Sequence, residues 1–360
     1  MTEPIVSVLI DTYNHERFIE EAIVSVLEQD FPAAETEILV VDDGSTDRTP
    51  EFVRRFEPRV RLLRKPNGGQ ASAFNFGIPE ATGEIIAFLD GDDWWAKTKL
   101  TAVAKAFERN PGVAAVGHGF YEVTGTGTSR EMLIPGKTCF VDLSSVDAAR
   151  LAEMGRGLLG TSRLAVRRKT LDRIGPIPNE LVFCADAPIM TLALGLGGAI
   201  VLDQPLCYYR QHSQNLFLHG PDDTARLRRR FEILEFLLAI LPRRLAELGI
   251  VAEVVDAFFA KDRVDLERLR LHFGQGGRWE TFGAERRSFQ ALYKGASPGY
   301  GLFKSAVGAC ALLLPPRRFE QLRAWYARNN MRRFRSILGK PEPRVPDEFI
   351  QRRSVLGRQS

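Results

Sequence analysis

Three carboxylates within four residues form the densest chemical feature of the sequence. Asp90, Asp92 and Asp93 directly follow the apolar run 84–89, which is rich in β-branched and aromatic side chains. Such a run is typical of a buried parallel strand, and open α/β sheets bind ligands where their strands end. Carboxylates this close repel one another, so a cation or hydrogen-bond donors must relieve the repulsion. A divalent ion that also holds a diphosphate would do so. The alternative is a solvated acidic loop that precedes a helix.

The elements that would position this loop alternate regularly along the chain. Further apolar runs predict strands at 5–10, 37–41 and 60–63, and amphipathic or polar-capped stretches predict helices after each of them. This alternation indicates an α/β fold, a doubly wound sheet with flanking helices. Polar loops follow the strands, so we expect them to meet at one edge of the sheet. These loops are 11–14, 42–47, 67–70 and 90–93.

The glycine-rich turn at Gly68 and Gly69 has two interpretations. Its N–H groups could cradle a phosphate at the start of the helix that follows, or the turn could be tight and bind nothing. It matches neither a Walker loop nor the Gly-x-Gly-x-x-Gly fingerprint, which argues against P-loop and Rossmann proteins.

Composition limits the other classes. The chain has 360 residues, 44% of them hydrophobic, which suits one large domain or two ordinary ones. The net charge is +4, and residues 315–360 hold 12 Lys/Arg against 4 Asp/Glu, so the tail is basic and the body mildly acidic. Four cysteines without paired spacing favour reduced thiols in a cytoplasmic protein. We recognise no secretory signal and no apolar window long enough to span a membrane.

Four motifs of the sequence resemble those of family 2 glycosyltransferases with the GT-A fold. They occur in the order and at the spacing found in that family. They lie at 8–14, 40–47, 67–77 and 88–93, and the resemblance covers residues 4 to 217. It implies a GT-A type doubly wound mixed sheet flanked by helices. It also implies an inverting, non-processive enzyme of the hexosyltransferase type, which uses a nucleotide-sugar donor with Mg²⁺ or Mn²⁺.

The resemblance also assigns roles to the loops. Thr12 and Tyr13 would line the nucleoside pocket, although the family often has Pro in place of Thr12. Asp42 would bind the base, Asp90 would face the ribose and the sugar, and Asp92 would ligate the metal ion. The donor-binding residues that it implies are Thr12, Tyr13, Asn14, Asp42, Asp43, Ser45, Asn67, Gly69, Gln70, Asp90, Gly91 and Arg210.

The acceptor side follows from the same resemblance. Inverting transfer needs a carboxylate to take the proton of the attacking hydroxyl. The family places this base in a Glu-Asp pair before a helix, where this chain has Ala185 and Asp186. Asp186 is therefore either the catalytic base or a helix N-cap. Thr161 and Ser162 would lie near the sugar, or would be ordinary polar residues of a strand.

The segment 204–215 resembles the closing Tyr-Arg-x-His element of the family. Arg210 would contact the diphosphate, and His212 would add a nitrogen ligand to the metal ion already held by Asp92. The alternative for His212 is an ordinary loop histidine.

The sequence predicts a series of helices in the C-terminal third, which we place at 218–338. We expect residues 339–360 to be a disordered tail. Residues 317–335 combine arginines with aromatic side chains. This pattern suits the surface of an anionic membrane, and the alternative is an ordinary packing helix with a solvated arginine face. We expect no nucleic-acid partner, and an oligomer is compatible with the sequence.

These observations predict transfer of a sugar, from UDP in our preference, to a glycan or a lipid-linked acceptor. The protein would lie in the cytoplasm or peripherally on the inner face of the membrane, and would serve polysaccharide assembly. Two alternatives stay open: a sugar-1-phosphate nucleotidyltransferase and a catalytically silent GT-A scaffold. The first would need a glycine-rich basic loop after the first strand, where the chain has Asp11 to Asn14.

Overall fold

The computed structural model describes residues 5–124, 129–132, 136–143, 159–212, 224–292, 298–319 and 321–322. These residues fall into two compact units, the first ending with residue 212 and the second beginning at residue 224. The predicted boundary at 217–218 and the predicted tail at 339–360 lie outside the described residues.

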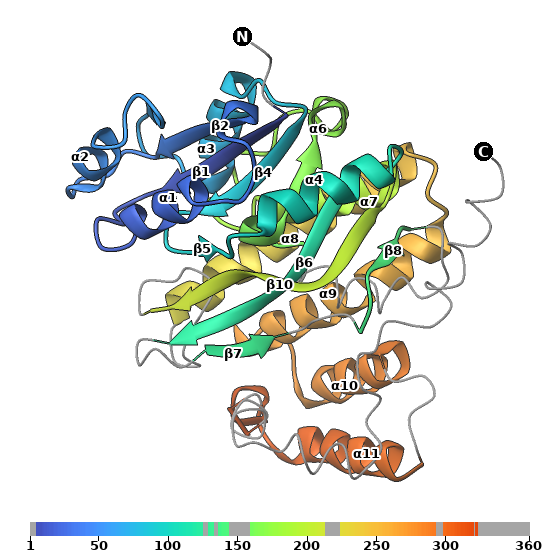
Figure 1. Ribbon diagram of the computed structural model, residues 1–360. Helices are drawn as coiled ribbons and strands as arrows, with labels where there is room; N and C mark the ends of the chain where they lie inside the picture. The colour runs from blue at the N-terminus through green and yellow to red at the C-terminus, as the bar shows by residue number, and fades with distance from the viewer. Residues whose placement is uncertain are drawn as a thin grey trace, which may run out of the picture. The chain divides into compact units, whose positions relative to one another are not determined.

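The first unit is built on one mixed sheet of ten described strands (Figure 1). The strands are β1 (Val6–Thr12), β2 (Thr36–Asp42), β3 (Arg61–Arg64), β4 (Ile85–Asp90), β5 (Trp94–Trp95), β6 (Ala115–Thr124), β7 (Ser129–Met132), β8 (Cys139–Val141), β9 (Ala165–Arg167) and β10 (Ala199–Gln211). Their order is β3-β2-β1-β4-β9-β6-β10-β5, with β7 beside β6 and β8 beside β10. The predicted α/β fold with a doubly wound mixed sheet is therefore confirmed.

Strand direction decides where the polar loops meet. β1 pairs in parallel with β2 and β4, and β2 pairs in parallel with β3, so all four end at one edge. In this register Asp11 lies opposite Asp90, and Thr12 lies opposite Asp42. β9 runs antiparallel between β4 and β6 and joins this half to the parallel pair β6–β10.

Helices cover both faces of the sheet because successive strand residues point to opposite sides. Val8 and Ile10 of β1 share a buried cluster with α1 (Ile19–Leu27) and α4 (Lys99–Arg109), which lie in front of the sheet in Figure 1. On the other face α3 (Gln70–Gly77) packs closely on Leu9, so closely that a Cβ at Gly77 would lie 2.7 Å from a Leu9 methyl group. The remaining helical segments are α2 (Thr49–Arg54), α6 (Arg168–Ile174), α7 (Asp186–Leu196), η1 (Ala33–Glu35), η2 (Ile78–Glu80) and η3 (Thr161–Arg163).

One local prediction needs correction. Thr161 and Ser162 do not lie in a strand: they belong to the 3-10 turn η3, and β9 begins only at Ala165. The turn closes with a hydrogen bond from the Leu164 N–H to the Thr161 carbonyl (3.1 Å), which propensity alone did not predict.

The segment with the Tyr-Arg-x-His element belongs mostly to a strand. β10 continues past Leu202 to Gln211 through register shifts on both sides of Pro205, which has no N–H to donate. His212 follows directly after this strand.

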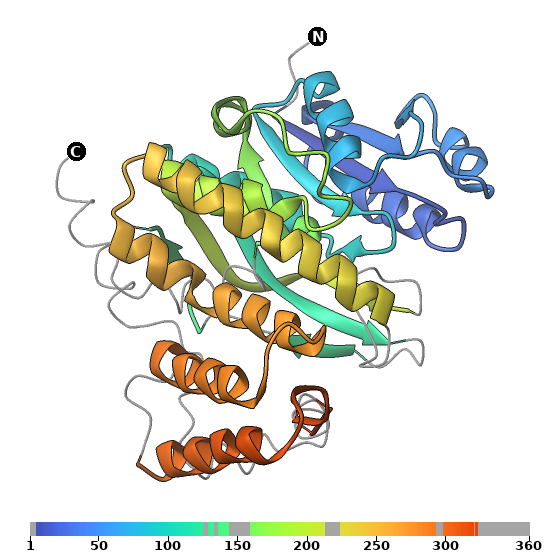
Figure 2. The ribbon, with the colours of Figure 1, turned by 180° about the vertical axis from the view of Figure 1, so that it is seen from behind.

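The second unit consists of helices, as predicted for the C-terminal region (Figure 2). They are α8 (Thr224–Glu247), α9 (Ala252–His272), α10 (Arg278–Leu292) and α11 (Pro298–Leu313), and each packs against the next. Within it Arg268 and Glu285 form a buried ion pair of 2.6 Å. None of the helices in the described part of the chain is both long and apolar enough to cross a membrane. The part of the predicted basic helix that follows residue 322 lies outside the described residues.

Candidate functional site

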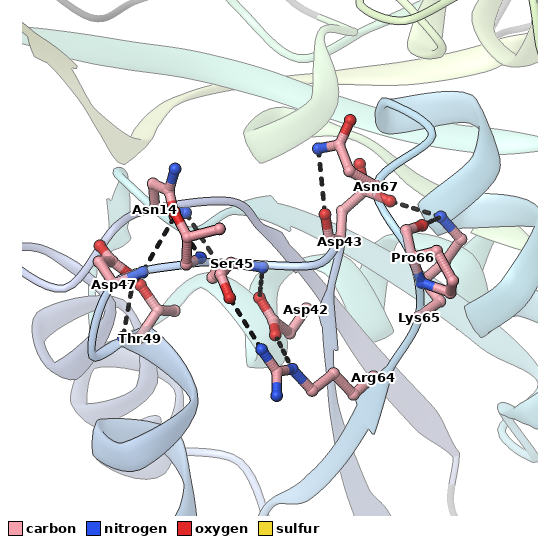
Figure 3. A network of polar contacts seen from close by, with 11 residues as sticks. Asn14, Asp42, Asp43, Ser45, Asp47, Thr49, Arg64, Lys65, Pro66 and Asn67 are labelled. Carbon is pink, nitrogen blue, oxygen red and sulfur yellow. Dashed lines mark hydrogen bonds and ion pairs between the residues drawn. The ribbon is translucent and has the colours of Figure 1, made fainter.

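The loop after β2 is held by its own carboxylate. Asp42 is fully buried; its Oδ1 accepts the Ser45 N–H (3.0 Å) and its Oδ2 accepts the Arg64 Nε–H (2.8 Å). Arg64 also donates to the Ser45 carbonyl (2.8 Å). Figure 3 shows this arrangement, in which a side chain from the end of β3 clamps the loop of β2. The loop that sequence assigned to the nucleobase is therefore rigid.

Asp43 organises the neighbouring glycine turn. Its carboxylate accepts the N–H groups of Gly68 (3.0 Å) and Gly69 (2.7 Å) and pairs with Lys65, while Asn67 donates to its backbone carbonyl (3.1 Å). These glycine N–H groups bind a protein carboxylate, which favours the tight-turn interpretation of this segment. Gly69 has φ +84°, and a Cβ there would lie 2.6 Å from the Cα atom of Val182.

Asn14 connects the loop after β1 to the same network. Its N–H donates to Ser45 Oγ (2.9 Å), and its side-chain oxygen accepts the Thr46 N–H (2.8 Å). Its φ of +56° is one that Asn adopts more readily than most residues. Beside it Tyr13 is 43% exposed, whereas Thr12 is buried against Gly91. Of these residues Tyr13 alone offers a ring to solvent.

Gln70 joins the end of β4 to η3 and to the residue before α7. Its amide nitrogen donates to Asp90 Oδ1 (3.0 Å) and to Thr161 Oγ1 (3.2 Å), and its amide oxygen accepts the Ala185 N–H (3.0 Å). Ser162 completes the bridge, since its hydroxyl donates to Asp90 Oδ2 (3.2 Å). A single amide thus connects α3, β4, η3 and the residue before α7.

Asp186 is the first residue of α7. Its Oδ2 accepts the Thr161 N–H (3.1 Å). Burial raises the pKa of Asp186 above its ordinary value, and the charge of Arg163 together with N–H groups at the start of the helix opposes this rise. The carboxylate is therefore oriented by η3 and lies one residue from the Gln70 bridge. Ala185 contributes its backbone N–H where the family has a Glu side chain.

Four carboxylates crowd the end of β1 and β4. Burial and the charge of Asp92 raise the pKa of Asp11 to about 8, and the same causes raise the pKa of Asp93 to about 7. Burial and the neighbouring Asp11, Asp93 and Asp92 raise the pKa of Asp90 well above its ordinary value. Asp11 Oδ1 and Asp93 Oδ2 are buried and accept no hydrogen bond within the described structure. The cluster therefore has oxygen atoms available to a cation.

Asp92 differs from its neighbours because histidines face it. His212 Nε2 lies 2.8 Å from Asp92 Oδ2. Burial would raise the pKa of Asp92, but this hydrogen bond and the charges of His15 and His212 hold the pKa below its ordinary value. The two predicted metal ligands, 120 positions apart in the chain, are thus in contact. Among the described residues no group of three or more His, Cys, Asp or Glu side chains is arranged to hold a metal ion.

Arg210 supports this acidic loop from β10. Its N–H donates to Asp93 Oδ1 (2.9 Å), its Nε–H donates to the Asp92 carbonyl (2.9 Å), and the guanidinium pairs with Glu21. The guanidinium also stacks on Phe18 and Trp94, 5.0 and 4.3 Å from the ring centroids. Arg210 thus holds the acidic loop, and its contact with a diphosphate stays a prediction.

The sequence predicts no role for Asp11, His15, Lys99 or Arg163, although Asp11 lies in the predicted polar loop 11–14. The Lys99 amine is fully buried, lies 3.5 Å from the Trp95 ring centroid and donates to the Ser162 carbonyl (2.8 Å), which also accepts the Trp95 indole N–H (2.9 Å). These two hydrogen bonds from Lys99 and Trp95 hold η3 in position. A carboxylate at the end of β1 was the one signal that could have identified Asp11; the other contacts depend on the tertiary structure.

Comparison with known proteins agrees with this geometry. The sequence profile of Glycosyl transferase family 2 matches residues 7–156. An uncharacterized glycosyltransferase of Nostoc sp. is 34% identical over 235 residues, which cover 61% of this chain and 69% of the relative. The chain belongs to family 2 of the glycosyltransferases. It is accordingly a glycosyltransferase enzyme. The uncharacterized glycosyltransferase EpsJ of Bacillus subtilis is 30% identical over 59% of this chain and 63% of its own length.

Solved structures show the same fold. The crystal structure of S. aureus TarS 1–349 superposes with a TM-score of 0.57 at 19% identity, covering 89% of this chain and 91% of that one. TarS 1–349 in complex with UDP-GlcNAc gives a TM-score of 0.56 at 21% identity over the same shares. The family 2 fold of this chain is therefore of the GT-A kind.

Proposed function

We propose that this glycosyltransferase moves a sugar from a nucleotide-sugar, UDP-linked in our preference, to an acceptor hydroxyl with inversion, and that Asp186 is the base. The observation that carries the proposal is the bridge from Asp90 through Gln70 to the residue before Asp186. It connects the carboxylate predicted to face the donor sugar to the carboxylate predicted to act on the acceptor.

The donor class is supported by the relatives and by the loops. TarS has been crystallised with UDP and with UDP-GlcNAc. In this chain the loops after β1, β2 and β3 form one rigid network at the sheet edge where open α/β sheets bind ligands. The exposed Tyr13 ring lies beside that network and offers a surface on which a base could stack.

Asp186 would act on the attacking hydroxyl. As the acceptor oxygen bonds to the anomeric carbon, the bond from that carbon to the diphosphate oxygen breaks, and the acceptor proton passes to the carboxylate. The Thr161 N–H orients one carboxylate oxygen, and burial keeps the carboxylate basic by raising its pKa. When it is ionised, Asp186 would be both oriented and basic, as a general base must be.

A divalent cation could be bound jointly by the acidic loop and by the diphosphate of the donor. Mg²⁺ is usually bound through one or two carboxylates together with substrate phosphates. Asp92 and His212 would hold it, and the buried Asp11 Oδ1 and Asp93 Oδ2 atoms, which accept no hydrogen bond within the described residues, lie in the same cluster of carboxylates. When bound, such an ion would neutralise the charge that develops on the diphosphate. We propose Mg²⁺ or Mn²⁺.

The acceptor is proposed by class alone. A relative, the poly(ribitol-phosphate) β-N-acetylglucosaminyltransferase TarS of Staphylococcus aureus, is 38% identical over 102 residues, 27% of this chain and 18% of that protein. The poly(ribitol-phosphate) in this name supports a glycan-type acceptor, and a lipid-linked acceptor stays a prediction. Peripheral membrane contact through residues 317–335 remains a prediction for the same class of acceptor.

The decisive experiment measures release of nucleoside diphosphate from a panel of nucleotide-sugars, with Mn²⁺ or with EDTA. We expect release from one donor with the metal and loss of release with EDTA. If no nucleotide-sugar is hydrolysed, the same panel is tested for binding by calorimetry. The absence of both release and binding for every donor would refute the proposed function.

A further inference from the structure

One guanidinium in the site, that of Arg163, forms no hydrogen bond or ion pair with the residues that the structure describes. Arg163 ends η3. Its Nε is completely buried. A buried N–H donor that binds nothing is costly, and such groups call for an explanation.

The other basic side chains around the site are engaged. Arg64 pairs with Asp42 and Lys65 with Asp43. Arg210 pairs with Glu21, and Lys99 donates to the Ser162 carbonyl. Arg163 therefore differs from its neighbours in having unused donors rather than in its charge.

Aromatic rings hold this guanidinium in place. Its central carbon lies 4.4 Å from the ring centroid of Phe120 on β6 and 5.8 Å from that of Tyr209 on β10. Stacking fixes the plane of a guanidinium and leaves its N–H edge free to donate. On the other side Gly160 makes room, because a Cβ there would collide with the Arg163 Nη2 atom.

The guanidinium lies close enough to the proposed base to influence it. After burial, the charge of Arg163 is the largest influence on the pKa of Asp186, which it lowers. Arg163 and Asp186 meet at the same turn. Arg163 is the last residue of η3, and Asp186 accepts the N–H of Thr161, the first residue of η3. A group bound by Arg163 would thus lie within the reaction site.

We infer that Arg163 binds a phosphate oxyanion of a substrate in this site. The planar fork of an arginine matches the oxygens of a phosphate in a bidentate manner. The inference rests on the proposed function, and the phosphate has two sources: the diphosphate of the donor, or a phosphate carried by the acceptor. Each source gives a different result in the experiment below.

The experiment compares wild type with Arg163→Gln and Gly160→Ala by isothermal titration. One arm titrates UDP and, separately, uridine. The other arm titrates inorganic phosphate into protein saturated with UDP. Gly160 has φ −75° and ψ 165°, which alanine adopts without strain, so Gly160→Ala displaces the guanidinium without removing it. Arg243→Gln, at an exposed position of α8 in the second unit, is the control with the same change in net charge.

Loss of a charge-assisted hydrogen bond weakens binding by about tenfold or more. A loss of this size for UDP, with uridine unaffected, assigns the phosphate to the donor. Unchanged UDP binding with the same loss for inorganic phosphate assigns it to the acceptor. Both variants should agree, and Gly160→Ala decides the question if Arg163→Gln does not fold.

The inference is overturned if both variants bind UDP as wild type does and phosphate binding is either unchanged or absent in all proteins. That result would leave the proposed function intact, because wild type would still bind UDP. Failure of wild type to bind any nucleotide or nucleotide-sugar would instead contradict the proposed function.

Discussion

Among single residues, the proposed chemistry depends on carboxylates whose pKa values are shifted in different directions by their surroundings. Asp92 is kept ionised by His212, whereas Asp11 and Asp90 are buried side by side with raised pKa values. Asp186 lies apart from this cluster, oriented by one N–H group. Similar residues thus acquire different protonation behaviour from their surroundings.

We expect Asp186→Asn to lower kcat by about 10²-fold or more, because the amide cannot accept the acceptor proton. UDP binding should stay within about twofold of wild type, since the substitution keeps the shape of the side chain. Initial rates of UDP release and calorimetry measure the two effects. A variant with kcat near wild type would exclude Asp186 as the base.

The pH dependence follows from the raised pKa of Asp186. A base must be ionised to act, so kcat/KM should fall as the pH is lowered through this pKa, above the range of an ordinary aspartate. The charges that face the carboxylate are Arg163, which favours ionisation, and Asp90, which opposes it. Arg163→Gln should therefore move the acidic limb of the profile to higher pH. A limb that stays in place would show that another group titrates there.

At the scale of elements, η3 is the part that brings the two halves of the site together. Lys99 and Trp95 bind the Ser162 carbonyl from one side, and Gln70 and Asp90 bind Thr161 and Ser162 from the other. The turn can therefore hold Asp186 in a fixed position relative to Asp90.

Gln70→Ala should lower kcat by about tenfold or more, because it removes the bridge between Asp90 and Ala185. UDP binding should change less, because the loop after β2, which is predicted to bind the nucleobase, is not altered. The matched control is Asn75→Ala on the same helix. Asn75 also bridges α3 to a distant segment, binding the carbonyl and the N–H of Ile177 at 2.6 and 2.8 Å. We expect the control to lower the thermal midpoint but to leave kcat unchanged. Equal kcat losses in both variants would mean that Gln70 acts through stability alone.

In the helical unit, the Arg268–Glu285 pair is a test of local stability. Removing one partner of a buried pair costs about 3–5 kcal/mol, whereas replacing both with apolar residues costs much less. Glu285→Ala should therefore unfold at lower urea concentration than Arg268→Met/Glu285→Leu. Exposed Glu247→Ala, which loses a pair with Arg243, serves as the control with little effect. A double variant no more stable than Glu285→Ala would contradict this explanation.

At the scale of the whole molecule, donor binding should couple to stability. A ligand that binds only the folded protein stabilises it by about 2.7 kcal/mol at 100 times its dissociation constant. UDP with Mn²⁺ should raise the thermal midpoint by a few degrees, and EDTA should remove most of the gain. Uridine alone should give a smaller shift, because it lacks the diphosphate. Equal shifts with and without EDTA would argue against a metal-assisted site.

Local sequence patterns were enough to predict the alternation of strands and helices, the polar loops at one sheet edge and the family. These features depend on hydrophobic periodicity and on short motifs, which act over a few residues. The sequence also named Asp92 and His212, which the structure shows in contact. The roles of the individual donor residues stay predictions.

Only the tertiary structure decided which distant side chains meet. Asp11 lies beside Asp90 because β1 and β4 pair in one particular register, and Thr161 and Ser162 form a turn because Gln70, Asp90 and Asp186 bind them there. Arg163 forms no hydrogen bond or ion pair within the described residues, because β6 and β10 present rings to it rather than carboxylates. Such contacts depend on strand order and register across many residues, and no local pattern encodes them.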